Sequence, residues 1–80
     1  MVKVVFFARI REQLGCAELN VEVSSLATLV ASLKQRGELW ARVLSEPNLI
    51  CAINQVVFDG NDRELEQGDE VAFFPPVTGG

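Results

Sequence analysis

Hydrophobic and polar positions predict strands at both ends of the chain. The run Val2–Ala8 is β-branched and aromatic, which is typical of a strand, and both of its faces are apolar near its end. Residues Leu19–Val23 alternate apolar with polar side chains, which indicates a half-exposed strand and the antiparallel neighbour of the first. Glu70–Phe74 predicts the last strand, because Pro75 and Pro76 lack the backbone donors that a longer ladder needs. The chain therefore begins and closes with strands.

The middle of the chain predicts one strong amphipathic helix. Its apolar residues, spaced i, i+3, i+4 and i+7, are Leu26, Leu29, Val30 and Leu33. Either Ser24 or Ser25 can cap its start, and Gly37 directly follows its basic last turn. Shorter helical segments are expected at Arg9–Leu14 and Glu38–Leu44.

Two short strands, Leu49–Ile53 and Val56–Phe58, are predicted on either side of the turn Asn54-Gln55. A polar connection, Arg63–Gln67, follows with Leu65 as its one apolar residue. The order strand, strand, helix, strand, strand, strand favours an α+β fold of the β-grasp kind, a mixed sheet of about five strands with one main helix on one face. The first and last strands would then lie side by side at the centre of the sheet.

Strand parity predicts an uncovered apolar patch. The set that faces the main helix is taken to be Val4, Phe6, Val71 and Phe73. Their sequence neighbours must then face the other way, where no second helix is available. These neighbours are Val5, Phe7, Ala72 and Phe74. Open patches of this type usually mark interfaces, although loops could fold over this face or the parity could be reversed.

The net charge of the chain limits the kinds of ligand that we expect. The chain of 80 residues has 7 Lys and Arg against 11 Asp and Glu, a net charge of −4. We therefore expect neither nucleic acid nor an anionic membrane as a ligand, since phosphate contacts need clustered basic side chains. Because the sequence shows no apolar run long enough to span a membrane and no signal peptide, we expect one cytoplasmic domain.

Side chains for catalysis or metal binding are scarce. The sequence has no His and no Tyr, and it lacks the common phosphate-binding and nucleophile motifs. Cys16 and Cys51 are far apart in sequence, and neither has a His to activate it. We expect no metal site, a buried Cys51 thiol in a strand and an exposed Cys16 beside a turn. A self-contained catalyst is not expected.

The last residues are the strongest candidate for chemistry. We divide the chain into a β-grasp domain, 1–74, and an extended, flexible tail, 75–80. The tail would reach about 20 Å at about 3.3 Å per residue. Gly79-Gly80 can pass a narrow channel because neither residue has a side chain, and this would offer the Gly80 carboxylate to a partner. A carboxylate is a poor electrophile, so its use requires activation, most simply adenylation by ATP on a partner enzyme. An idle tail is the alternative.

A family resemblance rests on three segments, Met1–Glu12, Ala52–Gln55 and Gly68–Gly80. Together they resemble the small sulfur-carrier subunits of molybdopterin synthase, the MoaD type of the ubiquitin-like MoaD/ThiS family. The ending Phe-Phe-Pro-Pro-Val-Thr-Gly-Gly is highly specific, whereas a bare Gly-Gly is shared with ubiquitin and the thiamine-pathway carrier. Asp59–Glu66 departs most from the family, which leaves the contacts of this loop open.

The resemblance implies several partners and no permanently bound cofactor. An adenylating enzyme related to ubiquitin-activating enzymes would use ATP to convert the Gly80 carboxylate to an acyl-adenylate. Sulfur from a sulfur-donating enzyme would then leave a C-terminal thiocarboxylate. The tail would enter the large synthase subunit and give its sulfur to cyclic pyranopterin monophosphate, forming the dithiolene of molybdopterin. Two carriers and two large subunits would form a heterotetramer, with the catalytic side chains in the large subunit.

The resemblance also assigns site residues. Gly80 would be the working group, as 1-thioglycine or glycyl adenylate. The residues in the partner's channel would be Pro75, Pro76, Val77, Thr78 and Gly79. The residues that pack on the partners would be Phe7, Arg11, Val57 and Phe74. Two other functions stay open: a protein modifier that forms isopeptide bonds as ubiquitin does, and an interaction module with an inert tail.

Overall fold

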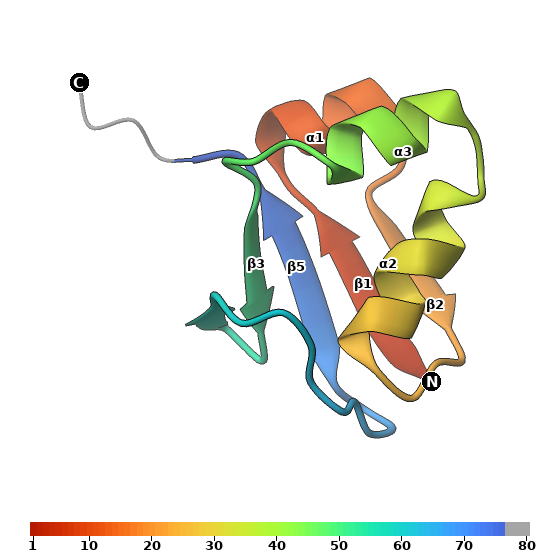
Figure 1. Ribbon diagram of the computed structural model, residues 1–80, viewed down its shortest axis with the longest axis vertical. Helices are drawn as coiled ribbons and strands as arrows, with labels where there is room; N and C mark the ends of the chain where they lie inside the picture. The colour runs from red at the N-terminus through yellow and green to blue at the C-terminus, as the bar shows by residue number, and fades with distance from the viewer. Residues whose placement is uncertain (77–80) are drawn as a thin grey trace.

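The computed structural model describes residues 1–76 and shows a mixed sheet whose helices share one core with it (Figure 1). The strands are β1 (Val2–Phe6), β2 (Glu18–Val21), β3 (Ile50–Ile53), β4 (Val56–Phe58) and β5 (Glu70–Phe74). The helices are α1 (Ala8–Leu14), α2 (Leu26–Lys34) and α3 (Glu38–Leu44). No helix within residues 1–76 is long and apolar enough to cross a membrane.

The sheet has the strand order β2-β1-β5-β3-β4, so the first and last strands lie together at its centre. β1 and β5 are parallel, with Val4 opposite Val71, and the other neighbouring pairs are antiparallel. This arrangement confirms the predicted fold class and the central pairing. The two shorter helices extend the core at one end of the sheet, where α1 and α3 pack against each other (Figure 1).

Helix α2 forms where the apolar spacing predicts it. Leu26, Leu29 and Leu33 are buried, and Ser25 is the N-cap, its hydroxyl accepting a bond from the Thr28 N–H at 3.1 Å. The helix ends at Lys34, earlier than predicted, and Gly37 caps the start of α3 instead of closing α2. The hydroxyl cap satisfies one of the free N–H groups at the helix start, which fixes where α2 begins.

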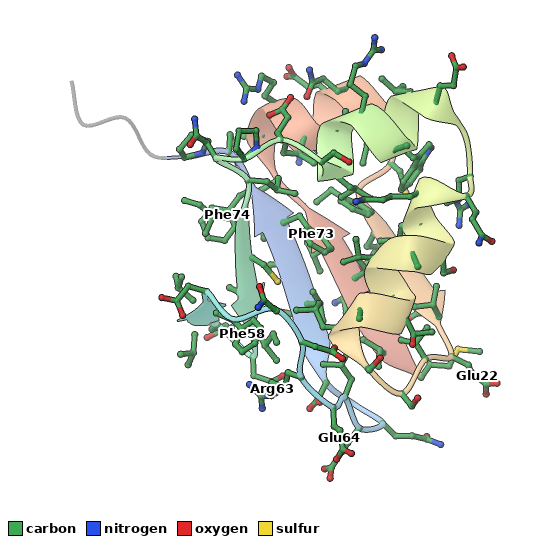
Figure 2. All side chains as sticks on the ribbon, viewed as in Figure 1. Glu22, Phe58, Arg63, Glu64, Phe73 and Phe74 are labelled. Carbon is green, nitrogen blue, oxygen red and sulfur yellow. The ribbon has the colours of Figure 1, made fainter. Side chains whose placement is uncertain are left out.

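The loop Asp59–Glu66 holds the start of α2. The Asp62 carboxylate accepts the Ala27 N–H at 2.8 Å, and the Leu26 N–H donates to the Arg63 carbonyl at 2.8 Å. Leu65 is buried, which confirms its prediction as the apolar residue of this connection. Figure 2 labels Arg63 and Glu64 on this loop, near the N-terminal end of α2. The loop therefore supplies bonds that α2 cannot make internally.

The turn between β3 and β4 is tied to the start of β5. Asn54 and Gln55 both have positive φ, 51° and 70°, as a two-residue hairpin turn requires. The Asn54 side chain donates to Asp69 Oδ1 and accepts the Glu70 N–H, each at 3.0 Å. The backbone N–H of Glu66 and then the Asn54 amide hold the pKa of Asp69 below its ordinary value. This network fixes the hairpin against the sheet.

Two predictions about the cysteines need correction. Cys51 is half-buried rather than buried, because it lines two surface grooves, one between α2 and the sheet and one beside β3 and β4. Desolvation nevertheless raises the pKa of its thiol to about 11. Cys16 is also half-buried rather than exposed, because it packs against the core, and its Sγ lies 3.6 Å from the Glu18 carbonyl oxygen. Both thiols are free in the structure.

Candidate functional site

The face of the sheet opposite the helices carries an uncovered apolar surface, which we call the outer patch. Its members are Val5, Phe7, Ile50, Val57 and Phe74. Strand register assigns them to one face, because Ile50 is paired with Phe74, and a row across the sheet joins Val57 to Val5 through two small, buried alanines. Phe7 is 46% exposed and Val57 64% exposed. The predicted open patch is therefore confirmed for Phe7 and in part for Val5 and Phe74, which are half-buried, whereas Ala72 is 7% exposed because its short side chain lies between larger neighbours.

The last two residues of β5 show the parity directly. Phe73 is 2% exposed and stacks on Phe6 with ring centroids 5.9 Å apart, beneath the helices. Phe74 is half-buried and points to the other side of the sheet (Figure 2). The alternative with reversed parity is wrong, and so is the alternative in which loops cover Phe7. Side chains therefore alternate between core and outer patch up to the end of the strand.

Phe7 and Phe74 contact each other within the outer patch. Their ring centroids are 6.4 Å apart and the ring planes meet at 78°, an edge-to-face arrangement. The Phe7 N–H donates to the Phe73 carbonyl at 3.0 Å, so the parallel pairing of β1 and β5 continues to this point. Ala8 then turns the chain into α1 with φ of 51°, a conformation rare for residues with a Cβ. The turn leaves the Phe7 ring on the outer face.

Arg11 lies in α1, close in sequence to Phe7 of the outer patch. Its N–H donates to the Phe7 carbonyl at 3.3 Å, which places it one helical turn along α1 from Phe7. Its side chain is exposed, and it takes part in neither of the ion pairs seen within residues 1–76. The second of these pairs joins Arg9 to Glu46 at 3.5 Å. An exposed cation one turn from Phe7 suits an acidic group on a partner.

The structure thus brings three of the four predicted interface residues, Phe7, Val57 and Phe74, onto one face. Arg11 lies on α1, one helical turn from Phe7. The prediction missed Ile50, which lies directly opposite Phe74. The sequence contained the information needed to place Ile50. Leu49, Cys51 and Ile53 occupy alternate positions and share one face of the strand, so Ile50 must lie on the opposite face. Whether these residues contact a partner stays a prediction.

The tail begins where the outer patch ends. Pro75 and Pro76 follow β5 directly and are half-buried. Four predicted site residues, Val77, Thr78, Gly79 and Gly80, lie outside the described residues. Their assignment to a partner's channel, the chemistry of Gly80 and the flexible tail of 75–80 therefore stay predictions.

Few side chains in the described part of the chain are arranged for chemistry. Within residues 1–76, no group of three or more His, Cys, Asp or Glu side chains lies close enough to hold a metal ion. Cys51 lies on the helix side of the sheet, paired with Phe73 and away from the outer patch. The described surface therefore presents an apolar patch beside the end of β5 rather than a set of reacting side chains.

Comparisons with known proteins agree with this geometry. The model of the ThiS family matches residues 4–80. A protein named molybdopterin synthase sulfur carrier subunit from Escherichia coli (strain K12) is 40% identical over 82 residues, which covers 100% of both chains. The protein of the same name from Haemophilus influenzae is 42% identical over 83 residues, again covering 100% of both.

Solved structures show the same fold. The small archaeal modifier protein 1 from Methanosarcina acetivorans matches with a TM-score of 0.81 at 28% identity, covering 99% of this chain and 95% of that one. A chain from the complex of subunits 1 and 2 of molybdopterin-converting factor from Helicobacter pylori matches with a TM-score of 0.75 at 29% identity, covering 99% and 97%. The β-grasp fold of this chain is therefore found both in a protein named as a modifier and in one named as part of molybdopterin-converting factor.

Proposed function

The chain belongs to the ThiS family, and from this premise we propose that it is the sulfur carrier subunit of a molybdopterin synthase. The full-length similarity to two carriers of that name supports the proposal. The structural observation that carries it is the position of the outer patch at the end of β5. A partner docked on Phe7 and Phe74 is thereby placed next to Pro75, where the tail begins.

In this proposal the reactive group is the carboxylate of Gly80. An adenylating enzyme related to ubiquitin-activating enzymes binds the tail and ATP, a carboxylate oxygen attacks the α-phosphorus, and pyrophosphate leaves. Hydrosulfide released by a sulfur-donating enzyme then attacks the acyl carbon, AMP leaves as the C–O bond breaks, and loss of the sulfur-bound proton leaves a thiocarboxylate. The carrier itself supplies no acid or base to these steps, which suits a sequence without His.

The second partner is the large subunit of the synthase. We propose that residues 75–79 enter its channel and that the thiocarboxylate at Gly80 gives its sulfur to cyclic pyranopterin monophosphate. The dithiolene of molybdopterin has two sulfurs, so two thiocarboxylates each give one and each returns to a Gly80 carboxylate. The side chains that catalyse these steps belong to the large subunit. Two carriers and two large subunits would form a cytoplasmic heterotetramer.

Mass spectrometry of the chain purified from cells tests the proposal. We expect a fraction whose mass exceeds that of the unmodified chain by the difference between sulfur and oxygen, localised to Gly80. Deleting Gly80 should abolish this fraction and molybdopterin formation while leaving the thermal unfolding midpoint unchanged. A Gly80 deletion that still supports molybdopterin formation would show that the tail is inert.

A protein modifier is the second candidate, favoured by the likeness to small archaeal modifier protein 1. It needs the same carboxylate and the same activation but forms isopeptide bonds with lysines. The same preparation distinguishes the two functions, because conjugation produces a ladder of high-mass species that contain the chain. A ladder without thiocarboxylate would replace the first proposal by the second.

A further inference from the structure

Strand β4 forms one edge of the sheet and is apolar on both of its faces. Val56 is 68% exposed and Val57 is 64% exposed, more than any other large hydrophobic residue among 1–76. Consecutive strand residues point to opposite faces, so Val56 lies on the helix side and Val57 on the outer side. Sheet edges are usually protected by charged residues or proline, which β4 lacks. The β4 edge therefore presents apolar side chains above and below the plane of the sheet.

The backbone of β4 also has hydrogen-bonding groups that point away from β3, in the plane of the sheet. In a hairpin with a two-residue turn, the residues that flank the turn exchange both hydrogen bonds, and here these are Ile53 and Val56. The next pair, Ala52 and Val57, is then of the non-bonded kind. The N–H and C=O of Val57 consequently point away from β3. This edge offers one donor and one acceptor to an added strand.

A groove of about 350 Å³ continues this edge toward the end of β5. Its lining includes Pro47, Leu49, Ile50, Val57, Phe58 and Gly60. Ile50 is paired with Phe74, so the groove adjoins the last residue before Pro75. Figure 1 shows residues 75–76 leaving the sheet on the side of β3. The β4 edge, the groove and the start of the tail therefore lie along one side of the molecule.

We propose that the large synthase subunit that receives the tail also adds an extended segment to the β4 edge. Its backbone pairs with Val57, and its side chains pack over Val56 on one face and Val57 on the other, as in strand addition to other sheet edges. The inference rests on the proposed function. The large subunit is chosen as occupant because the edge is continuous with the outer patch through Val57 and Ile50.

A second copy of this chain is a poorer occupant. Pairing two β4 strands would join only three residues from each chain, and each copy carries a net charge of −4. Such a contact is far smaller than a stable interface, and like charges oppose it.

Hydrogen–deuterium exchange of the chain, alone and with the large subunit, tests the inference. We expect the Val57 amide to exchange rapidly in the free chain and at least tenfold more slowly in the complex, whereas the Phe58 amide, bonded within the hairpin, is slow in both. A complex in which Val57 exchanges at the free rate would refute strand addition and leave the proposed function intact. Absence of any complex would refute both. Protection of Val57 in the chain alone that rises with concentration would assign the edge to a second copy.

Two lysine substitutions separate edge pairing from simple coverage of the outer patch. Val56→Lys changes a side chain on the helix side, which a partner resting only on the outer patch would not touch. We expect at least tenfold weaker binding of the large subunit, measured by isothermal titration calorimetry. Leu39→Lys, another exposed apolar residue but on α3, is the matched control and should bind as the unmodified chain does. Unchanged affinity of Val56→Lys would overturn the inference.

Discussion

The rings of Phe7 and Phe74 meet edge to face, with centroids 6.4 Å apart, although the two residues lie near opposite ends of the sequence. The contact exists because β1 and β5 run parallel at the centre of the sheet and end at the same side. One aromatic pair therefore marks both the outer patch and the point where the tail begins. A partner that recognises this pair is positioned relative to the tail without any contact to the tail itself.

Replacing Phe74 should affect association more than stability. Phe74→Ala is expected to weaken binding of the large subunit by about 1–3 kcal/mol, the range for an aromatic interface residue. Phe73→Ala is the matched comparison, because Phe73 is 2% exposed and its loss should cost about 3–5 kcal/mol of unfolding free energy. Urea unfolding and calorimetric titration of both variants measure the two quantities. A Phe74→Ala chain as unstable as Phe73→Ala would place Phe74 in the core.

Adding one methyl group near the C-terminus should impair transfer without affecting the fold. We expect Gly79→Ala to lower the yield of thiocarboxylate at least tenfold, because a Cβ obstructs a channel shaped for glycine. Thiocarboxylate is measured by mass spectrometry after incubation with the adenylating enzyme, ATP and a sulfur donor. An unchanged thermal unfolding midpoint of Gly79→Ala is the control for the fold. Equal yields from Gly79→Ala and the unmodified chain would argue against insertion into a channel.

Acid should weaken the contribution of Asp69 to stability. Its pKa is lowered first by the Glu66 N–H and then by the Asn54 amide, so the folded state favours the carboxylate. The stabilisation is present above the ordinary pKa of 3.8 and is lost as pH falls through the lower folded value. Asp69→Ala should therefore be less stable than the unmodified chain near neutral pH, and the difference should shrink in acid. Urea unfolding between about pH 7 and about pH 2 measures it. A difference that is constant with pH would contradict the assignment.

Cys51 should react slowly with alkylating agents while the chain is folded. Burial raises the pKa of its thiol from 9.0 to about 11, and only the thiolate reacts. At about pH 8 the thiolate fraction, and with it the rate, should fall about a hundredfold relative to the unfolded chain. Iodoacetamide labelling of a Cys16→Ser variant, with and without urea, isolates this thiol. Equal rates in the two conditions would show that Cys51 is freely accessible.

The regular part of the fold was predictable because local patterns agree with tertiary placement. Three elements have the bounds that the sequence predicted: β4 at Val56–Phe58, β5 at Glu70–Phe74 and α3 at Glu38–Leu44. The outer patch followed from parity, because each strand has one residue set that must face the core. These features depend on periodicity, which a single sequence contains.

Contacts between distant loops were not predictable. The bond from the Ala27 N–H to Asp62 and the bond from Asn54 to Asp69 join residues whose separation no periodic pattern encodes. The half-burial of Cys51 has the same origin, because it depends on how closely α2 packs over β3, two elements whose spacing no periodic pattern encodes. Carboxylates and amides in polar stretches have the same appearance in sequence whether they are solvated or bonded.

The ladder between β1 and β5 has a consequence for synthesis in the cell. Lys3 pairs beside Glu70, so the middle of the sheet cannot close until the last strand has emerged from the ribosome. Until then Val4 and Phe6 lack strand β5, which buries them in the folded chain. The nascent polypeptide therefore exposes apolar surface to chaperones and proteases. A product terminated early, before Glu70, would be degraded rather than compete for partners.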